Sequence, residues 1–273
     1  MRAYQLPKGG AGIDALAKVD RPQPKPGHRQ VLVKVAACSL NFRDLGIVRG
    51  TYRVPVPDNI VPLSDGAGEV VEVGSDVRRV KVGDKVAGCF FQRWPGGEAP
   101  ADAHATALGG GVDGMLAEYV VLEEDGVVKF PAHLSLEEAA TLPCAAVTVW
   151  HAMMEHGKMI AGQTVLLQGT GGVSVFGLQL AHAMGMQSVI TSSSLARISE
   201  SSIRPEAKVS PLRVTVGTAM TPSRSISSWK SEPSTTVWVT PGLSTASASS
   251  AWTTVGQFWQ VSDMYVTKWC SPV

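Results

Sequence analysis

Residues 164–191 constrain the fold more than any other part of this 273-residue chain. A short apolar run, residues 164–168, enters a glycine turn at 169–172, and a second apolar run follows at 188–191. Between them, apolar side chains recur at helical spacing, at Val173, Phe176, Leu180 and Ala183. This pattern predicts a strand, a tight turn, a helix and a second strand. Such a unit aims backbone N–H groups and a helix N-terminus at one point, where a phosphate can bind.

The glycine turn supplies the candidate cofactor-binding residues. A glycine at its first position can adopt backbone angles closed to other residues, and one at its third lets a pyrophosphate approach closely. Ser174 stands where the G-x-G-x-x-G pattern expects its last glycine, so the strict pattern is broken and an ordinary tight turn is the alternative. The residues that we expect to contact a dinucleotide are Gly169, Thr170, Gly171, Gly172 and Val173.

Composition excludes several classes of partner. The net charge of +1 creates no field that favours nucleic acid or a membrane surface. No apolar run reaches the roughly 20 residues of a membrane span, and the N-terminus does not read as a signal peptide. The four cysteines form no CxxC pair, which argues against a zinc knuckle or a disulfide framework. We therefore expect a cytoplasmic protein that acts on a small-molecule substrate.

The first half of the chain is rich in predicted strands. Residues 30–37, 68–73 and 85–88 are β-type runs separated by Gly and Asp turns, which predicts a small barrel or sandwich. Residues 92–114 have little periodicity and predict a surface loop. Ser135 and Glu138 form a capping box at the start of the helix that leads into the next domain.

Four segments in order resemble one known family. They are AACSLNFRDL (36–45), GAGEVVEVGSDVRRVKVGDKVAG (66–88), LEEAATLPCAAVTVWHAM (136–153) and the glycine turn. Together they resemble the medium-chain dehydrogenase/reductase family, and most closely its zinc-independent, quinone-oxidoreductase-like branch. The resemblance implies an α/β plus β fold, with a GroES-like strand-rich catalytic domain at residues 1–130. An incomplete Rossmann-type dinucleotide-binding domain follows at 131–194, and then a poorly ordered tail at 195–273.

Zinc enzymes of this family hold the metal through Cys, His or Glu, and Cys. Here the matching positions hold Asn41, the pair Ser64-Asp65, and Cys144. Catalytic zinc needs three protein ligands of the Cys, His or carboxylate type, and Cys144 alone matches a ligand of the family. We therefore predict no metal site and interpret Cys144 as a small, buried, apolar residue.

The resemblance also implies roles for three polar residues. Asn41 and Tyr52 would lie near the carbonyl or quinone oxygen of the substrate and donate hydrogen bonds to developing negative charge. Thr148 would pack near the nicotinamide. The alternatives are a turn-capping Asn41, a half-buried aromatic at Tyr52 and a threonine that bonds its own helix at position 148.

The residues after the second predicted strand favour NADP(H). NAD-binding proteins usually place Asp or Glu there to bind the ribose 2′-hydroxyl. This chain has Ser192, Ser193 and Ser194 instead, with no carboxylate to repel a 2′-phosphate and three hydroxyls that could donate to one. A plain polar turn is the alternative.

The composition changes after Ser194. Residues 195–273 hold 16 Ser, 10 Thr and five of the seven Trp, but only four acids, and no useful helical period. We hypothesise that this part is translated out of frame or comes from an unspliced or wrongly assigned exon; a genuine Ser/Thr-rich disordered tail is the alternative. The units through which relatives form homodimers are not recognisable, which makes a homodimer doubtful for this chain.

The sequence thus predicts an oxidoreductase that transfers hydride between NADP(H) and a small carbonyl, quinone, enone or alcohol, without zinc. Two alternatives stay open. One is a catalytically inactive truncated remnant, and the other is a nucleotide-binding or structural protein without turnover.

Overall fold

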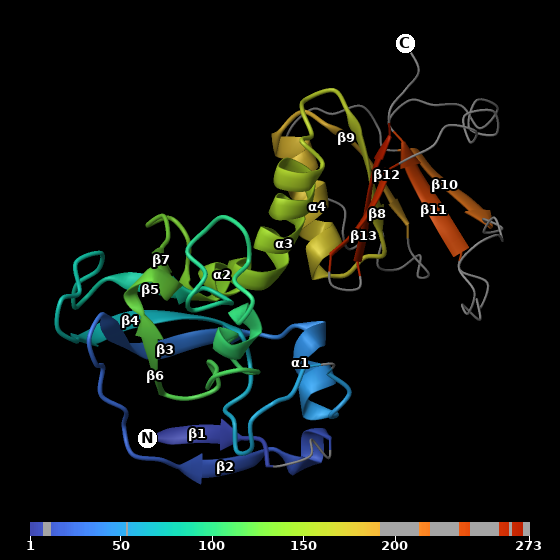
Figure 1. Ribbon diagram of the computed structural model, residues 1–273. Coiled ribbons are helices and arrows are strands. Elements are labelled where there is room, and N and C mark those ends of the chain that lie inside the picture. Colours follow the sequence, from blue (N-terminus) through green and yellow to red (C-terminus); the bar gives the residue numbers. More distant parts are fainter. Residues whose placement is uncertain are drawn as a thin grey trace. The chain divides into compact units, whose positions relative to one another are not determined.

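The computed structural model describes residues 1–7, 12–52, 54–191, 213–218, 235–240, 257–261 and 264–269. The chain divides into two compact units, Met1–Ala145 and Ala146–Val273 (Figure 1). The three domain ranges derived above from the sequence remain predictions. Within the described residues, no helix has the length and apolar character needed to cross a membrane.

The first unit is built mainly of strands, with short helices between them. Its strands are β1 (Arg2–Gln5), β2 (Ala17–Asp20), β3 (Gln30–Ser39), β4 (Asp65–Val73), β5 (Lys85–Gly88), β6 (Tyr119–Glu123) and β7 (Val127–Lys129). Its helices are η1 (Ile13–Ala15), α1 (Phe42–Val48), η2 (Ala103–Thr106), η3 (Glu124–Gly126) and α2 (Leu136–Ala140), and η4 (Leu142–Ala146) ends at the boundary.

A five-stranded antiparallel sheet, with strand order β6-β3-β4-β5-β7, forms the centre of this unit. The three predicted strands are confirmed as β3, β4 and β5. Val31, Val33, Val70 and Val86 are fully buried on this sheet, as β-branched residues in strands commonly are. The strand-rich character expected of the first half is therefore present.

Helix α2 covers the sheet through small side chains. The predicted capping box is confirmed, because the Ser135 N–H donates to Glu138 Oε2 at 2.8 Å and the Glu138 N–H donates to Ser135 Oγ at 3.1 Å. Ala139 and Ala140 then pack with Ala67 of β4 and its neighbours in a cluster composed mostly of alanines. Small residues let the helix approach the sheet closely.

Two irregularities interrupt the pairing of β3 with β4. The register shifts between Leu32 and Val33 and again between Val35 and Ala37. After the second shift, Cys38 pairs with Gly66 and Ser39 pairs with Asp65. Such bulges re-aim the side chains that follow them, and this one determines the side-chain alternation at the start of β4.

The prediction of a surface loop at residues 92–114 holds for 93–102, which are exposed or half-buried and irregular, but it is wrong for the part that follows. Ala103, Ala107 and Leu108 are at most 5% exposed, and Leu108 packs in the core cluster that contains Val33 and Val70 of the sheet.

The buried Gln92 amide joins two main-chain segments, because its Nε2 donates to the carbonyls of Cys89 and Gly126 at 2.8 and 3.1 Å. The main chain of the buried segment is satisfied as well, because the Gln92 N–H donates to the Thr106 carbonyl at 3.1 Å and the Leu108 N–H donates to the Phe90 carbonyl at 2.9 Å. An irregular segment can therefore be buried with its polar groups paired.

The second unit contains the predicted strand–turn–helix–strand. Its elements are α3 (Val147–Trp150), η5 (His151–His156), β8 (Thr164–Gln168), α4 (Gly172–Ala183), β9 (Gln187–Thr191), β10 (Arg213–Thr218), β11 (Thr235–Thr240), β12 (Gln257–Val261) and β13 (Met264–Trp269). Strands β8 and β9 pair in parallel from Thr164–Gln187 to Gln168–Thr191. Helix α4 connects them, so the predicted order of strand, turn, helix and strand is confirmed. The predicted helix face is only partly correct: Val173, Phe176 and Leu180 are half-buried against the core and Ala183 is exposed, whereas the buried positions of the helix are the small residues at 174, 177 and 181.

The sheet of this unit has the order β12-β13-β8-β9, and β13 runs antiparallel to β8. In a doubly wound sheet, the neighbour of the first strand on that side is a parallel strand from the second βαβ half. The Rossmann-type arrangement is therefore incomplete. Of the predicted tail, 195–273, the structure describes β10 to β13, and its other residues lie outside the described part of the chain.

Candidate functional site

Asn41 and Asp44 form the turn that begins α1. The Asn41 N–H donates to Asp44 Oδ2 at 2.8 Å, which closes the first turn of the helix. Asn41 is thus a capping residue, as the alternative interpretation proposed. The side chain of Asn41 faces the Asp44 N–H in the capping box. Its Nδ2, at the other branch of the amide, is buried without a hydrogen-bond partner among the described residues. Such a nitrogen can donate to a ligand.

Asp65, at the start of β4, is a fully buried carboxylate beside this turn. Ser64 Oγ donates to its Oδ1 at 3.0 Å, and the Cys144 N–H donates to its Oδ2 at 3.1 Å. Burial raises the pKa of Asp65 to about 6, although favourable interactions with the Asn41 amide, the Ser64 hydroxyl and the Cys144 N–H oppose the rise. The structure therefore brings Asn41, Ser64-Asp65 and Cys144 together.

Two neighbouring groups share this environment. Burial also raises the pKa of Asp44, against the opposing effect of the hydrogen bond from the Asn41 N–H. Cys38 is exposed as a residue, but partial burial of its thiol and the nearby Asp44 and Asp65 charges raise the pKa of that thiol to about 11, and its Sγ donates to the Met115 carbonyl at 3.1 Å. A thiol in this state is protonated at neutral pH and is a poor nucleophile.

This donor set is a poor fit for zinc. Zinc favours thiolate, imidazole and carboxylate ligands, whereas Asn41 offers an amide and both oxygens of Asp65 already accept hydrogen bonds. Across the described residues, no three His, Cys, Asp or Glu side chains gather closely enough to hold a metal ion. Cys144 is half-buried rather than fully enclosed.

Tyr52 is connected to the α1 turn through Arg43, which the sequence interpretation did not single out. Arg43 Nε donates to the Tyr52 hydroxyl at 3.3 Å, and Nη1 donates to the Leu108 carbonyl at 2.8 Å. The guanidinium lies 5.1 Å from the centroid of the Tyr52 ring and 4.4 Å from that of Phe90. Tyr52 itself is half-buried and packs against an apolar cluster around Ile47. The sequence signal that could have identified Arg43 is a cation placed between an aromatic residue and Asp44 at the start of a short helix whose remaining residues are uncharged.

The glycine turn of the second unit has open space where a ligand would need it. Gly169 has φ +81°, a conformation that favours glycine, and Gly171 is the N-cap of α4. A Cβ atom at either position would meet no described atom within 4 Å. The turn, together with Thr170 and with Gly172 and Val173 in the first turn of α4, forms the predicted phosphate-binding element.

In place of the third glycine of the pattern, Ser174 ties helix α4 to the end of β8, and Gly177 allows the close packing of α4 on the strands. Ser174 is buried, and its Oγ donates to the Gln168 carbonyl at 2.9 Å, which ties the helix to the end of β8. A Cβ atom at Gly177 would lie only 2.7 Å from Leu167 Cδ2 and 2.9 Å from Val149 Cγ2. Gly177, one turn further along, therefore provides the close helix–strand packing. The sequence interpretation missed it.

We expect Gly177→Ala to lower the free energy of unfolding of the second unit by about 1–3 kcal/mol, because the added methyl group overpacks a buried contact. Gly171→Ala is the matched control. It adds the same methyl group in open space at an ordinary φ of −78°, so it should cost less than about 1 kcal/mol while it obstructs a pyrophosphate. Urea unfolding of both variants tests this expectation, and equal losses would contradict it.

The remaining predicted cofactor residues have less structural support. Thr148 lies half-buried on α3, next to the buried Val149 that packs against Gly177. Ser192, Ser193 and Ser194 lie outside the described residues. The roles of all predicted site residues, including Asn41 and Tyr52, remain predictions.

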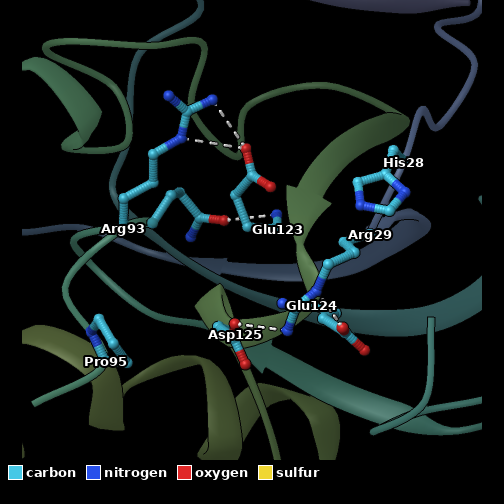
Figure 2. A pocket seen from close by; sticks show the side chains of 8 residues that line it. His28, Arg29, Arg93, Pro95, Glu123, Glu124 and Asp125 are labelled. Carbon is cyan, nitrogen blue, oxygen red and sulfur yellow. Dashed lines mark hydrogen bonds and ion pairs between the residues drawn. The ribbon is translucent and has the colours of Figure 1, made fainter. Parts of the chain in front are cut away.

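A separate charged cleft of about 350 Å³ lies in the first unit (Figure 2). It is lined by His28, Arg29, Gln92, Arg93, Pro95, Glu123, Glu124 and Asp125. Its cations are paired: Arg29 Nε lies 2.7 Å from Glu124 Oε1, and Arg93 Nη2 lies 3.1 Å from Glu123 Oε1. The cleft contains none of the predicted site residues.

Comparison with known proteins supports one family. The alcohol dehydrogenase GroES-like domain family matches residues 27–132. The zinc-type alcohol dehydrogenase-like protein of Schizosaccharomyces pombe is 45% identical over 190 residues, which are 67% of this chain and 54% of that protein. A chloroplastic quinone-oxidoreductase homolog of Spinacia oleracea is 34% identical over 66% of this chain and 52% of its own length.

The fold agrees with these sequence matches. A crystal structure of a protein from Sinorhizobium meliloti 1021, assigned as an alcohol dehydrogenase, superposes with a TM-score of 0.68 at 37% identity. The match covers 73% of this chain and 59% of that protein. The chain thus spans about half the length of the curated relatives that it matches.

Proposed function

We propose that this chain derives from an oxidoreductase. The premise is that it belongs to the medium-chain dehydrogenase/reductase family through its GroES-like and partial dinucleotide-binding regions. The proposed oxidoreductase transfers hydride between NADP(H) and a small carbonyl, quinone, enone or alcohol, and it does so without zinc. The names of the relatives, which include alcohol dehydrogenases and quinone oxidoreductases, support this reaction class.

The observation that carries the proposal is the buried, unpartnered Nδ2 of Asn41 beside Asp65. Hydride addition to a carbonyl or quinone places negative charge on the oxygen. An amide N–H held in a dry site stabilises that charge without having to reorganise. The Tyr52 hydroxyl, which accepts from Arg43, retains its own hydrogen to donate. In this scheme the nicotinamide supplies the hydride, and the protein binds and orients both partners.

The choice of NADP(H) rests on the sequence after β9. Three consecutive serines with no carboxylate suit a 2′-phosphate better than a free 2′-hydroxyl. The open glycine turn at the N-terminus of α4 suits the pyrophosphate that both cofactors share. The near-neutral net charge supports a small-molecule substrate over nucleic acid or a membrane surface, since it provides no field that attracts either.

Titration of the full chain with NADPH, followed by fluorescence, and then addition of a quinone, tests the proposal. NADPH oxidation on adding the quinone would support it. NADPH binding without turnover would favour the nucleotide-binding or structural alternative, and absence of binding would favour the inactive remnant. Gly171→Ala is the control, since loss of its NADPH signal would locate binding at the glycine turn.

The coding DNA tests the origin of residues 195–273. We expect another reading frame, beginning near codon 194, to encode the alternating strands and amphipathic helices of a complete dinucleotide-binding domain. If no frame does so, the hypothesis of a frame change or a wrongly assigned exon is wrong.

A further inference from the structure

The Asp65 carboxylate is held rigidly within the cluster that contains Asn41. It is fully buried, and donors from two separate segments fix it: the Ser64 hydroxyl at 3.0 Å and the Cys144 N–H at 3.1 Å. Neither donor depends on a bound ligand. The carboxylate therefore has a defined orientation in the unliganded protein.

The side-chain amide of Asn41, unlike the Asp65 carboxylate, is not fully hydrogen-bonded. The backbone N–H of Asn41 is fixed by Asp44, but its side-chain Nδ2 is buried and meets the geometry of a hydrogen bond with no described atom. Ser39, two residues before Asn41, pairs with Asp65 between β3 and β4, which places Asn41 near that carboxylate. The interaction between the Asn41 amide and Asp65 favours the ionised carboxylate. Since a carboxylate only accepts hydrogen bonds, the NH2 end of the amide must be the end that turns toward it.

We propose that Asp65 is a positioning residue for the substrate, whose carboxylate fixes the rotamer of the Asn41 amide so that Asn41 presents an N–H to the substrate oxygen. An amide NH2 group carries two hydrogens. One turns toward Asp65, and the other serves the carbonyl or quinone oxygen. The inference rests on the proposed function, because the substrate oxygen is the one assigned there.

The neighbouring charges define a matched control. Asp44 also contacts Asn41, but it binds the backbone N–H at 2.8 Å rather than the side chain. Arg43 Nη1 lies 4.0 Å from the other oxygen of Asp44. Asp44→Asn should therefore alter the main chain of Asn41 and leave the orientation of its amide unchanged.

The test is NMR spectroscopy of the full chain with 15N-labelled asparagine, in which the Asn41 side-chain signal is assigned by its loss in Asn41→Ala. In Asp65→Asn we expect this signal to move upfield and its hydrogens to exchange faster with water. In Asp44→Asn the Asn41 backbone signal should move, and the side-chain signal should not. Ser64→Ala, which removes one donor to Asp65, should produce a smaller change of the same kind.

The inference is overturned if the Asn41 side-chain signal is unmoved in both Asp65→Asn and Ser64→Ala, or if it moves in Asp44→Asn instead. A turnover measurement adds a second readout. Asp65→Asn should lower kcat/KM for quinone reduction about 10-fold, the value of one hydrogen bond to a charged site, with NADPH affinity unchanged. If the wild-type chain shows no turnover, the proposed function fails, while the NMR result still decides the role of Asp65.

Discussion

Glu124→Gln is expected to lower the free energy of unfolding by about 2–3 kcal/mol at pH 7, since it removes a charge that several donors stabilise. Glu124 is 2% exposed. Its carboxylate accepts from the Arg78 and Arg79 N–H groups at 2.8 and 3.1 Å and from Arg29 Nε at 2.7 Å. These hydrogen bonds, led by that from the Arg78 N–H, lower its pKa to about 2.

The stabilisation provided by the ionised Glu124 should depend on pH in a definite direction. A carboxyl group whose pKa is lower in the folded state stabilises the protein above the pKa of the unfolded chain, about 4.3. The stabilisation is lost as the pH falls toward 2. Hydrogen exchange of the β3 and β4 amides in the full chain should therefore show the largest difference between wild type and Glu124→Gln above pH 5, and almost none near pH 2.

Glu123→Gln is the matched control for this experiment. Glu123 pairs with Arg93, whose side chain is 70% exposed (Figure 2), and exposed ion pairs contribute less than about 1 kcal/mol. The prediction is contradicted if both substitutions cost the same, or if the loss caused by Glu124→Gln is independent of pH.

The opposite result is expected for Asp65→Asn, which should raise the free energy of unfolding at pH 8 by up to about 3 kcal/mol. Burial raises the pKa of Asp65 to about 6. A carboxyl group whose pKa is raised on folding makes stability fall as the pH rises from the unfolded value, about 3.9, through 6. An asparagine carries no charge, yet it can still accept from the Cys144 N–H and donate to Ser64 Oγ.

The same exchange measurement distinguishes this account from simple loss of packing. Wild type and Asp65→Asn should be equally stable below pH 4 and should diverge above pH 6. Ser64→Ala should change stability in the other direction at pH 8, since the carboxylate loses a donor but stays buried. An Asp65→Asn variant less stable than wild type at pH 8 would refute the prediction.

Local patterns in the sequence predicted the elements with strong periodicity. The apolar spacing around Phe176 and the glycine turn were sufficient for β8, α4 and β9. Ser135 and Glu138 were sufficient for the start of α2. These features depend on residues close together in the chain, and for that reason one sequence reveals them.

Features that depend on contacts between distant residues could not be predicted in the same way. The burial of Thr106, Ala107 and Leu108 accompanies main-chain bonds to residues 90 and 92, and the Gln92 amide in turn bonds the Gly126 carbonyl, 34 positions away. The close packing at Gly177 depends on Leu167 and Val149. The family resemblance identified the positions of Asn41, Asp65 and Cys144, but the burial of Asp65 and the unpartnered amide of Asn41 required coordinates.

The cluster around Asp65 depends on the register of β3 against β4, which is set by the bulge between Val35 and Ala37. Side chains of a strand alternate between faces, so a slip of one residue exchanges the faces of all that follow. Inserting one residue between Ala37 and Cys38 would place Cys38, rather than Ser39, opposite Asp65. The carboxylate would then lose its alignment with Asn41 although every chemical group was retained. In this fold, the length of a strand is thus as much a determinant of the chemistry as the identity of the residues at the site.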